Sequence, residues 1–126
     1  NGLEKLQFFL NKNTFWAKDR NKQQIYKMLS NSTVVVSLWH HNKLIGFGRA
    51  TSDLVFRAVL WDVVVAPDRQ GLGLGKLIME AILTNKKIRS VEKIYLMTTN
   101  RSEFYKQFGF KLNKEQSLLT INKNEY

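Results

Sequence analysis

Apolar residues recur every three or four positions in two stretches near the start of the chain, residues 3–10 and 21–31. This spacing places the apolar side chains on one face of a helix, so it predicts two short helices. Farther along, the apolar runs 33–39 and 44–52 flank the polar sequence HHNK. Two β-type runs around a short polar segment predict a β-hairpin whose turn lies in that segment.

A third β-type run, residues 56–65, is dense in β-branched and aromatic side chains and is followed by Pro67. Because proline cannot donate to a central ladder, we expect the strand to end before it. Beyond a glycine-rich stretch, apolar residues follow the spacing of a helix with one buried face. Residues 91–97 predict a further strand. The apolar positions of the predicted helix are Leu74, Leu77, Ile78, Ala81 and Ile82.

The last quarter of the chain predicts one more helix and two more strands. Asn100, with Glu103 three residues later, resembles a capping box that starts the short helix EFYKQF, and Gly109 can end this helix. Residues 110–112 and 117–121 are candidate closing strands. The predicted order is ααβββαβαββ, so the fold class is α/β, a mixed sheet flanked by helices.

Composition places these elements in one domain. A chain of 126 residues with 44% hydrophobic content can bury one core, so we expect a single domain over 1–126. The chain has no apolar stretch of about 18 residues, and its start lacks the features of a signal peptide. We therefore expect a soluble protein that is not secreted and has no membrane partner. The absence of cysteine excludes disulfides and thiolate metal sites.

The formal net charge is +10, from 20 Lys and Arg against 10 Asp and Glu. Such a charge favours anionic ligands, acidic partners or nucleic acid through long-range attraction. The basic residues are scattered without a long basic run, which argues against a nucleic-acid partner. His40 and His41 are adjacent in the predicted turn, where we expect exposed side chains and no metal site.

Three alternating glycines separate the strand from the helix in the stretch 63–83. A P-loop fails here because Gln70 stands where its first glycine belongs and Leu77 where its hydroxyl belongs. A dinucleotide fingerprint fails at Lys76 or Ile78, depending on its start. Glycines before a helix N-terminus can point backbone N–H groups at an anion, or they can simply make a tight turn.

The stretch VAPDRQGLGLG, residues 65–75, resembles the V-x-P-x-x-Q/R-G-x-G-x-G/A motif that binds acyl-CoA in the GNAT superfamily of N-acetyltransferases. EFYKQFGF, which contains Tyr105, resembles the family's F/L-Y-x-x-x-G-F segment. The element order is similar over nearly the whole chain, although a first strand before residue 3 is not evident. FWAKDR, LIGFGRATSD and LWDVVV resemble the compact GNAT proteins of cyanobacteria and plastids. The GNAT acyl-CoA N-acyltransferase fold implies a central parallel strand pair that splays apart.

The resemblance implies acetyl-CoA as the acetyl donor and no metal. The strand at Val63, Val64 and Val65 would pair with the pantetheine arm. Arg69 could also approach the phosphates, or be an ordinary solvated side chain. The residues that would cradle the pyrophosphate are Gln70, Gly71, Leu72, Gly73, Leu74, Gly75 and Lys76.

The resemblance also assigns catalytic candidates for direct attack of an amine on a thioester. Tyr105 would give a proton to the departing thiolate, with packing against the neighbouring phenylalanines as the alternative. Asp62 is a carboxylate inside a buried strand, on the face of Leu60 and Val64 if the alternation is regular, and burying it unpaired would be costly. It could take a proton from the amine, bind the ammonium, or only pair with an arginine, Arg49 or Arg57.

The acceptor implied by the family is a primary amine, with a protein lysine or an arylalkylamine such as serotonin favoured. Thr98, Thr99 and Asn100 are candidate polar lining of the strand cleft. Trp39, Trp61 and Phe47 either line the acceptor pocket or pack in the core. The resemblance places the protein in a plastid or the cytoplasm and is compatible with a homodimer. A non-catalytic CoA-binding regulator and a basic nucleic-acid-binding domain remain as alternatives.

Overall fold

The computed structural model describes residues 1–123. It contains the two N-terminal helices, the hairpin, the long third strand and the helix after the glycines that the sequence pattern predicts. The elements are α1 (Gly2–Asn13), α2 (Lys22–Ser30), β1 (Val34–His40), β2 (Lys43–Ser52), β3 (Arg57–Val65), the 3-10 helix η1 (Pro67–Arg69), α3 (Leu74–Leu83), β4 (Lys93–Tyr95) and α4 (Ser102–Lys106).

Local side-chain chemistry explains where these elements begin and turn. In α2, the Asn21 side chain accepts from the Gln24 backbone while the Gln24 side chain accepts from the Asn21 backbone, a complete capping box. In the hairpin, His41 and Asn42 both have positive φ, at 49° and 63°. A turn with two left-handed residues matches the twist of the flanking strands. None of the helices in residues 1–123 is long and apolar enough to cross a membrane.

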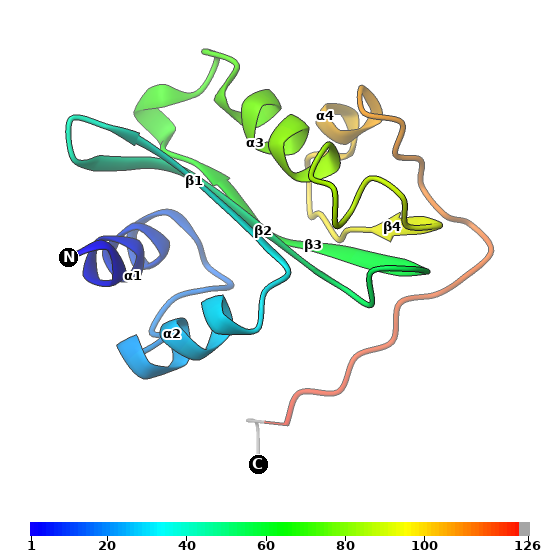
Figure 1. The fold of residues 1–126 in the computed structure, drawn as a ribbon, viewed down its shortest axis with the longest axis horizontal. Helices are drawn as coiled ribbons and strands as arrows, with labels where there is room; N and C mark the ends of the chain where they lie inside the picture. Colours follow the sequence, from blue (N-terminus) through cyan, green and yellow to red (C-terminus); the bar gives the residue numbers. More distant parts are fainter. Residues whose placement is uncertain (124–126) are drawn as a thin grey trace.

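The four strands form one mixed sheet in the order β1-β2-β3-β4, antiparallel except for the parallel pair β3 and β4. Figure 1 shows α1 and α2 on one side of this sheet and α3 on the other. The parallel pairing spans three residues and stops at Val59 and Tyr95. From Leu60 onward β3 has no β4 partner, so the two strands separate as the family resemblance implies.

Each face of the sheet has its own hydrophobic core. On one face, α1 contributes Leu6, Phe9 and Leu10, which cluster with Phe47 of β2 and Val64 of β3. On the other face, α3 covers the sheet. The buried residues of this second core are Val34, Ala50, Ala58, Leu60, Ile78, Met79, Ile82 and Ile88.

A β-bulge in β3 explains why Leu60 and Val64 belong to different cores. Phe47 pairs with Val64 and Arg49 with Trp61, so the single residue Gly48 faces two residues of β3, Asp62 and Val63. Asp62 takes a positive φ of 55°, which is uncommon for a residue other than glycine. The expectation that Asp62 shares a face with both Leu60 and Val64 is therefore wrong, because the bulge interrupts the alternation.

Two expectations for the C-terminal quarter are also wrong. Residues 110–112 and 117–121 form no strand in the described part of the chain. Figure 1 shows this segment running outside the sheet, and Leu118 and Leu119 are 70% and 88% exposed. An apolar run becomes a strand only when a neighbouring edge supplies its hydrogen bonds, and none pairs with it here.

The capping box at Asn100 is also absent. The N-cap of α4 is Arg101, which makes no side-chain cap bond. The Thr98 hydroxyl accepts from the Arg101 backbone N–H instead, at 3.1 Å. Gly109 has a φ of 96° and its N–H donates to the Lys106 carbonyl, so it ends the helical segment as expected.

Candidate active site

A cavity of about 260 Å³ lies where β3 and β4 separate. Three parts of the fold surround it: the bulged segment of β3, the chain after β4, and the loop of residues 14–21 between α1 and α2. Its lining residues are Phe15, Trp16, Leu60, Trp61, Asp62, Val63, Leu96, Met97 and Tyr105. The walls are thus mostly aromatic and aliphatic, with Asp62 as the charged residue among the lining residues.

Asp62 sits at the bulge with its side chain almost fully buried, and both of its carboxylate oxygens accept hydrogen bonds. The Trp16 indole N–H donates to Oδ1 at 2.8 Å. The Arg49 Nε donates to Oδ2 at 2.9 Å, and Arg20 donates to the same oxygen at 3.2 Å. The expected pairing with Arg49 is confirmed, whereas Arg57 pairs with Glu92 at 3.0 Å.

These partners set the ionisation of Asp62. Burial alone raises the pKa of the carboxyl group, but the Arg49 hydrogen bond, the charges of Arg20 and Arg49 and the Trp16 hydrogen bond outweigh it. The pKa of Asp62 therefore lies below its ordinary value. The carboxylate is ionised at neutral pH, and it is a weaker base than an exposed aspartate.

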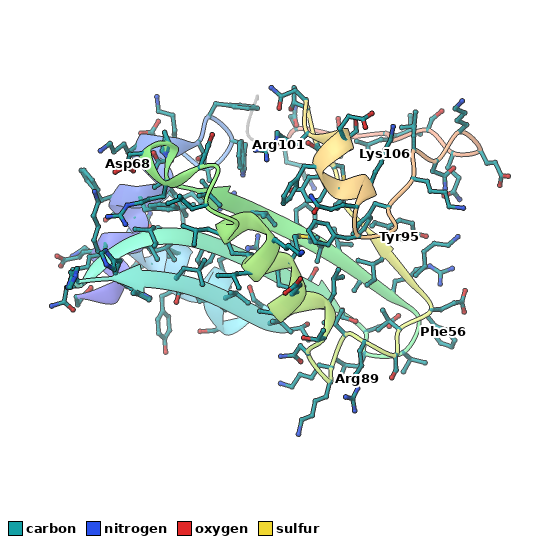
Figure 2. All side chains as sticks on the ribbon, turned by 90° about the horizontal axis from the view of Figure 1, so that it is seen from above. Phe56, Asp68, Arg89, Tyr95, Arg101 and Lys106 are labelled. Atoms are coloured by element: carbon teal, nitrogen blue, oxygen red, sulfur yellow. The ribbon has the colours of Figure 1, made fainter. Side chains whose placement is uncertain are left out.

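Tyr105 lies on α4 and lines the cavity together with Phe15 and Trp16 of the 14–21 loop. Its ring contacts Phe104 and Phe110 at centroid distances of 5.0 and 6.1 Å. Burial raises the pKa of the Tyr105 phenol, against a smaller opposing effect of the Arg101 charge. The phenol is accordingly protonated at neutral pH and can donate a proton. Figure 2 labels Arg101, the N-cap residue of α4, and Lys106, its last residue.

The glycine-rich turn brings β3 into α3 by way of η1. Gly71 and Gly73 have φ of 83° and 80°, so both occupy the left-handed region that glycine adopts without strain. Gly75 is needed for a different reason, because a Cβ there would lie 2.9 Å from the Phe104 ring. The motif glycines thus shape the turn and let α4 approach α3.

The N-terminus of α3 is not capped by a side chain. Gly73 is the N-cap residue and makes no cap bond, and no acidic residue lies in the first turn. The Leu77 N–H already bonds the Gly73 carbonyl at 3.1 Å, whereas the preceding N–H groups of the helix have no intrahelical carbonyl to reach. Backbone N–H groups and the helix dipole at such an end favour an anion.

The other charged candidates around the turn face protein partners. Arg69 approaches His40 at 3.3 Å and Asp68 at 3.8 Å, and Lys76 lies 4.0 Å from Glu80. Figure 2 places Asp68, beside this turn, and Arg101 toward one edge of the molecule and Phe56 and Arg89 toward the opposite edge. The turn and α4 therefore lie toward the end of the sheet at which β3 and β4 separate.

The aromatic and polar residues expected to line the acceptor pocket lie in different parts of the structure. Trp61 lines the cavity, whereas Phe47 is buried in the core beneath α1 and Trp39 is 43% exposed on β1. Thr98 lines a second cavity, between β4 and α4. Thr99 and Asn100 are exposed on the loop before α4.

Sequence reasoning missed Phe15, Trp16 and Arg20, which all belong to the 14–21 loop. A buried aspartate in a strand signals that donors must come from elsewhere, but the sequence nominates only Arg49 and Arg57 as its partners. Trp16 and Arg20 lie 46 and 42 residues from Asp62 along the chain. Such long-range partners have no local sequence pattern.

A mixed sheet whose parallel strands separate beside a glycine turn and an uncapped helix end defines a GNAT-type acetyltransferase domain. The sequence profile of the family described as "Acetyltransferase (GNAT) domain" matches residues 30–112. The chain therefore belongs to the GNAT family.

Individual relatives agree with this assignment. The chain is 39% identical over 100 residues to the uncharacterized N-acetyltransferase ycf52 of Pyropia yezoensis, a match covering 75% of this chain and 57% of that protein. It is 35% identical over 104 residues to serotonin N-acetyltransferase 2, chloroplastic, of Oryza sativa, covering 76% of this chain and 50% of the relative. Among solved structures, a GNAT-family protein of Xanthomonas campestris superposes with a TM-score of 0.86 at 24% identity, covering 97% of this chain and 86% of that one.

Proposed function

We propose that this chain transfers an acetyl group from acetyl-CoA to a primary amine. The observation that carries the proposal is the position of the cavity. It lies in the gap between β3 and β4, it contains the Tyr105 side chain, and it is at the end of the sheet where β3 leads into the glycine turn. Membership in the GNAT family supports this reading of the gap as the place where donor and acceptor meet.

The donor fits this part of the chain on two counts. Backbone N–H groups of the glycine turn and the α3 N-terminus, over Gln70 to Lys76, suit the pyrophosphate because they carry no competing side-chain cap. The β3 edge at Val63, Val64 and Val65 lacks a strand partner on the β4 side. This open edge suits the amide-bearing pantetheine arm, which can hydrogen-bond like a neighbouring strand.

The chemistry requires a neutral amine and a proton for the leaving thiolate. The amine nitrogen attacks the thioester carbonyl carbon, the carbon–sulfur bond breaks, and Tyr105 gives its phenolic proton to the sulfur. The new amide nitrogen loses its extra proton to water, and Tyr105 regains a proton from water. General acid assistance of this kind contributes about 10² to 10⁴-fold in rate. The raised pKa of Tyr105 keeps the donor protonated at neutral pH.

Of the three roles open to Asp62, pairing with an arginine has the strongest support. Both oxygens already accept hydrogen bonds from protein donors, and two guanidinium groups lie beside one carboxylate. A carboxylate held in this way is a weak base. We therefore propose that solvent removes the proton from the amine, and that Asp62 has a structural role at the site.

The cavity walls indicate the class of amine. The rings of Phe15, Trp16 and Trp61 suit an acceptor with a flat apolar body. An arylalkylamine has such a body. The Oryza relative named as a serotonin N-acetyltransferase supports this choice. A protein lysine, whose aliphatic stem is apolar, is the second candidate. The plastid relatives support a plastid location.

The decisive experiment is acetyl-CoA turnover against a panel of arylalkylamines, lysine peptides and polyamines, measured by release of free thiol. We expect turnover above the rate of acetyl-CoA hydrolysis, highest with an arylalkylamine. CoA binding in calorimetry without turnover on any amine would instead identify a CoA-binding regulatory domain. Steeply salt-dependent affinity for DNA or RNA without CoA binding would identify a nucleic-acid-binding domain.

A further inference from the structure

The 14–21 loop is tied to the sheet at one point, the carboxylate of Asp62. Trp16 and Arg20 lie near the two ends of this loop, and both donate hydrogen bonds to that carboxylate. Arg49 holds the same carboxylate from β2 and also contacts the Ser32 hydroxyl at 3.3 Å. A single buried side chain therefore connects the loop, the bulge of β3 and the middle of β2.

The orientation of Trp16 depends on this connection. The Trp16 side chain is 48% exposed, so packing alone does not hold it. Its other close ring contact is the edge of Phe15 at 5.1 Å, and Phe15 is itself 73% exposed. The backbone of the loop is anchored separately, since Ala17 is buried and its N–H donates to the Thr14 hydroxyl. Loss of the Asp62 bond would release the indole without unfolding the loop.

Trp16 also lines the cavity, together with Leu96, Met97 and Tyr105. The bulge contributes to this arrangement because it turns Asp62 toward the loop side of the sheet, while Val63 packs on the α3 side. An acceptor that occupies the cavity therefore lies within reach of Trp16.

We propose that Asp62 is a positioning residue that fixes Trp16 over the cavity, and that Trp16 determines which amines are accepted. This inference rests on the proposed acetyltransferase function. Trp16, held by its indole N–H, selects an amine carried on a flat apolar body, because an aromatic body stacks on the ring over a larger area than a short alkyl chain does. Arg20 and Arg49 act through the same carboxylate and are not among the residues that line the cavity.

The first test compares two amines, tryptamine and butylamine, in steady-state kinetics. For Trp16→Leu we expect kcat/KM for tryptamine to fall about tenfold more than that for butylamine, the size typical of a lost apolar contact. Trp39→Leu is the matched control, since Trp39 is similarly exposed at 43% but lies outside the cavity. Equal losses for both amines in Trp16→Leu, or the same selectivity change in Trp39→Leu, would overturn the specificity role.

The second test separates positioning from proton transfer. For Asp62→Asn we expect KM for tryptamine to rise about tenfold with kcat within a factor of about two, and the tryptamine preference to shrink as in Trp16→Leu. A collapse of kcat at unchanged KM would identify Asp62 as the base and overturn the proposal.

A third measurement does not depend on turnover. Amide hydrogen exchange of residues 14–20 should quicken in Asp62→Asn by more than exchange in α3, whose core amides report the loss of global stability, and CoA affinity in calorimetry should be unaltered. Unchanged exchange in residues 14–20 would show that Asp62 does not hold the 14–21 loop, and would overturn the proposal. If wild type binds CoA but acetylates no amine while the loop still loosens in Asp62→Asn, the proposed function fails and the positioning of the loop stands.

Discussion

At the scale of single residues, Tyr105 is the side chain on which the proposed chemistry depends. Its phenol, protonated at neutral pH at the ordinary pKa of tyrosine, is held further in that form because burial raises its pKa. Tyr105→Phe keeps the ring contacts with Phe104 and Phe110 but removes the proton. We expect kcat to fall by about 10²-fold while the affinity for acetyl-CoA stays within a factor of about two. Steady-state and single-turnover kinetics measure both quantities, and near-normal turnover would return Tyr105 to a packing role.

Asp62 predicts a pH-dependent contribution to stability. Its folded-state pKa is lowered, so its ion pairs contribute fully above the unfolded-state pKa of about 3.9 and are lost as the pH falls through the lower folded value. Asp62→Asn should lower the free energy of unfolding at pH 7 by about 3 kcal/mol, because it leaves two guanidinium groups without their carboxylate.

Chemical denaturation at pH 7 and again near pH 3 measures this difference. The gap between Asp62→Asn and wild type should narrow as the pH falls below the unfolded-state pKa, because the unfolded wild-type chain then binds a proton at Asp62 more readily than the folded protein does. A gap that stays constant over this range would mean that the ion pairs contribute nothing to stability.

The residues of the site differ in how far the sequence predicted them. The glycines of the turn and Tyr105 belong to local motifs, and the structure places both beside the separated strands. The burial of Asp62 was also predictable from its place in an apolar strand. Its partners Trp16 and Arg20 were not, since hydrogen bonds between residues more than forty positions apart leave no local pattern.

At the scale of elements, the turn between β3 and α3 gives the clearest prediction. A Cβ at Gly73 would meet no atom within 4 Å, but its φ of 80° strains any other residue. Relaxing that strain moves the N–H groups that the proposed pyrophosphate site uses. Gly73→Val should weaken CoA binding by about tenfold or more in calorimetry, since one or two good hydrogen bonds to an anion carry that much.

Gly109→Ala provides the control for this variant. Gly109 also has positive φ, at 96°, and also offers open space, but it follows α4 and not the turn. It should lose melting temperature comparably while keeping CoA affinity. Unchanged affinity in a folded Gly73→Val would remove the turn from the binding site.

Elements with strong local periodicity were predicted well, and those that depend on a distant neighbour were not. The helices α1, α2 and α3 carry their buried faces in their own sequences. The run 117–121 has the composition of a strand but lacks a partner edge, so it remains extended and exposed. The bulge in β3 could not be predicted from the sequence either, because it is defined by the pairing register of β3 against β2.

At the scale of the whole molecule, the charge of +10 bears on the choice of acceptor. Such a charge repels polyamines at long range, whereas tryptamine carries one positive charge and is repelled less. We expect kcat/KM for spermidine to lie below that for tryptamine at low salt. The gap should narrow at about 0.5 M salt, where the screening length falls below 5 Å. A preference for spermidine at low salt would show that local charges outweigh the net charge.

The bulge in β3 has one more consequence. If Asp62 is skipped in the numbering of β3, then Leu60, Trp61, Val63, Val64 and Val65 alternate regularly, with Leu60, Val63 and Val65 on the α3 side and Val64 on the α1 side. The sheet and both cores are thus complete without Asp62. β3 carries one residue more than its architecture requires, and that extra residue links the 14–21 loop to the sheet. On the proposed function, we expect that changes in this loop and at Asp62 can alter substrate choice while the sheet and the glycine turn stay the same.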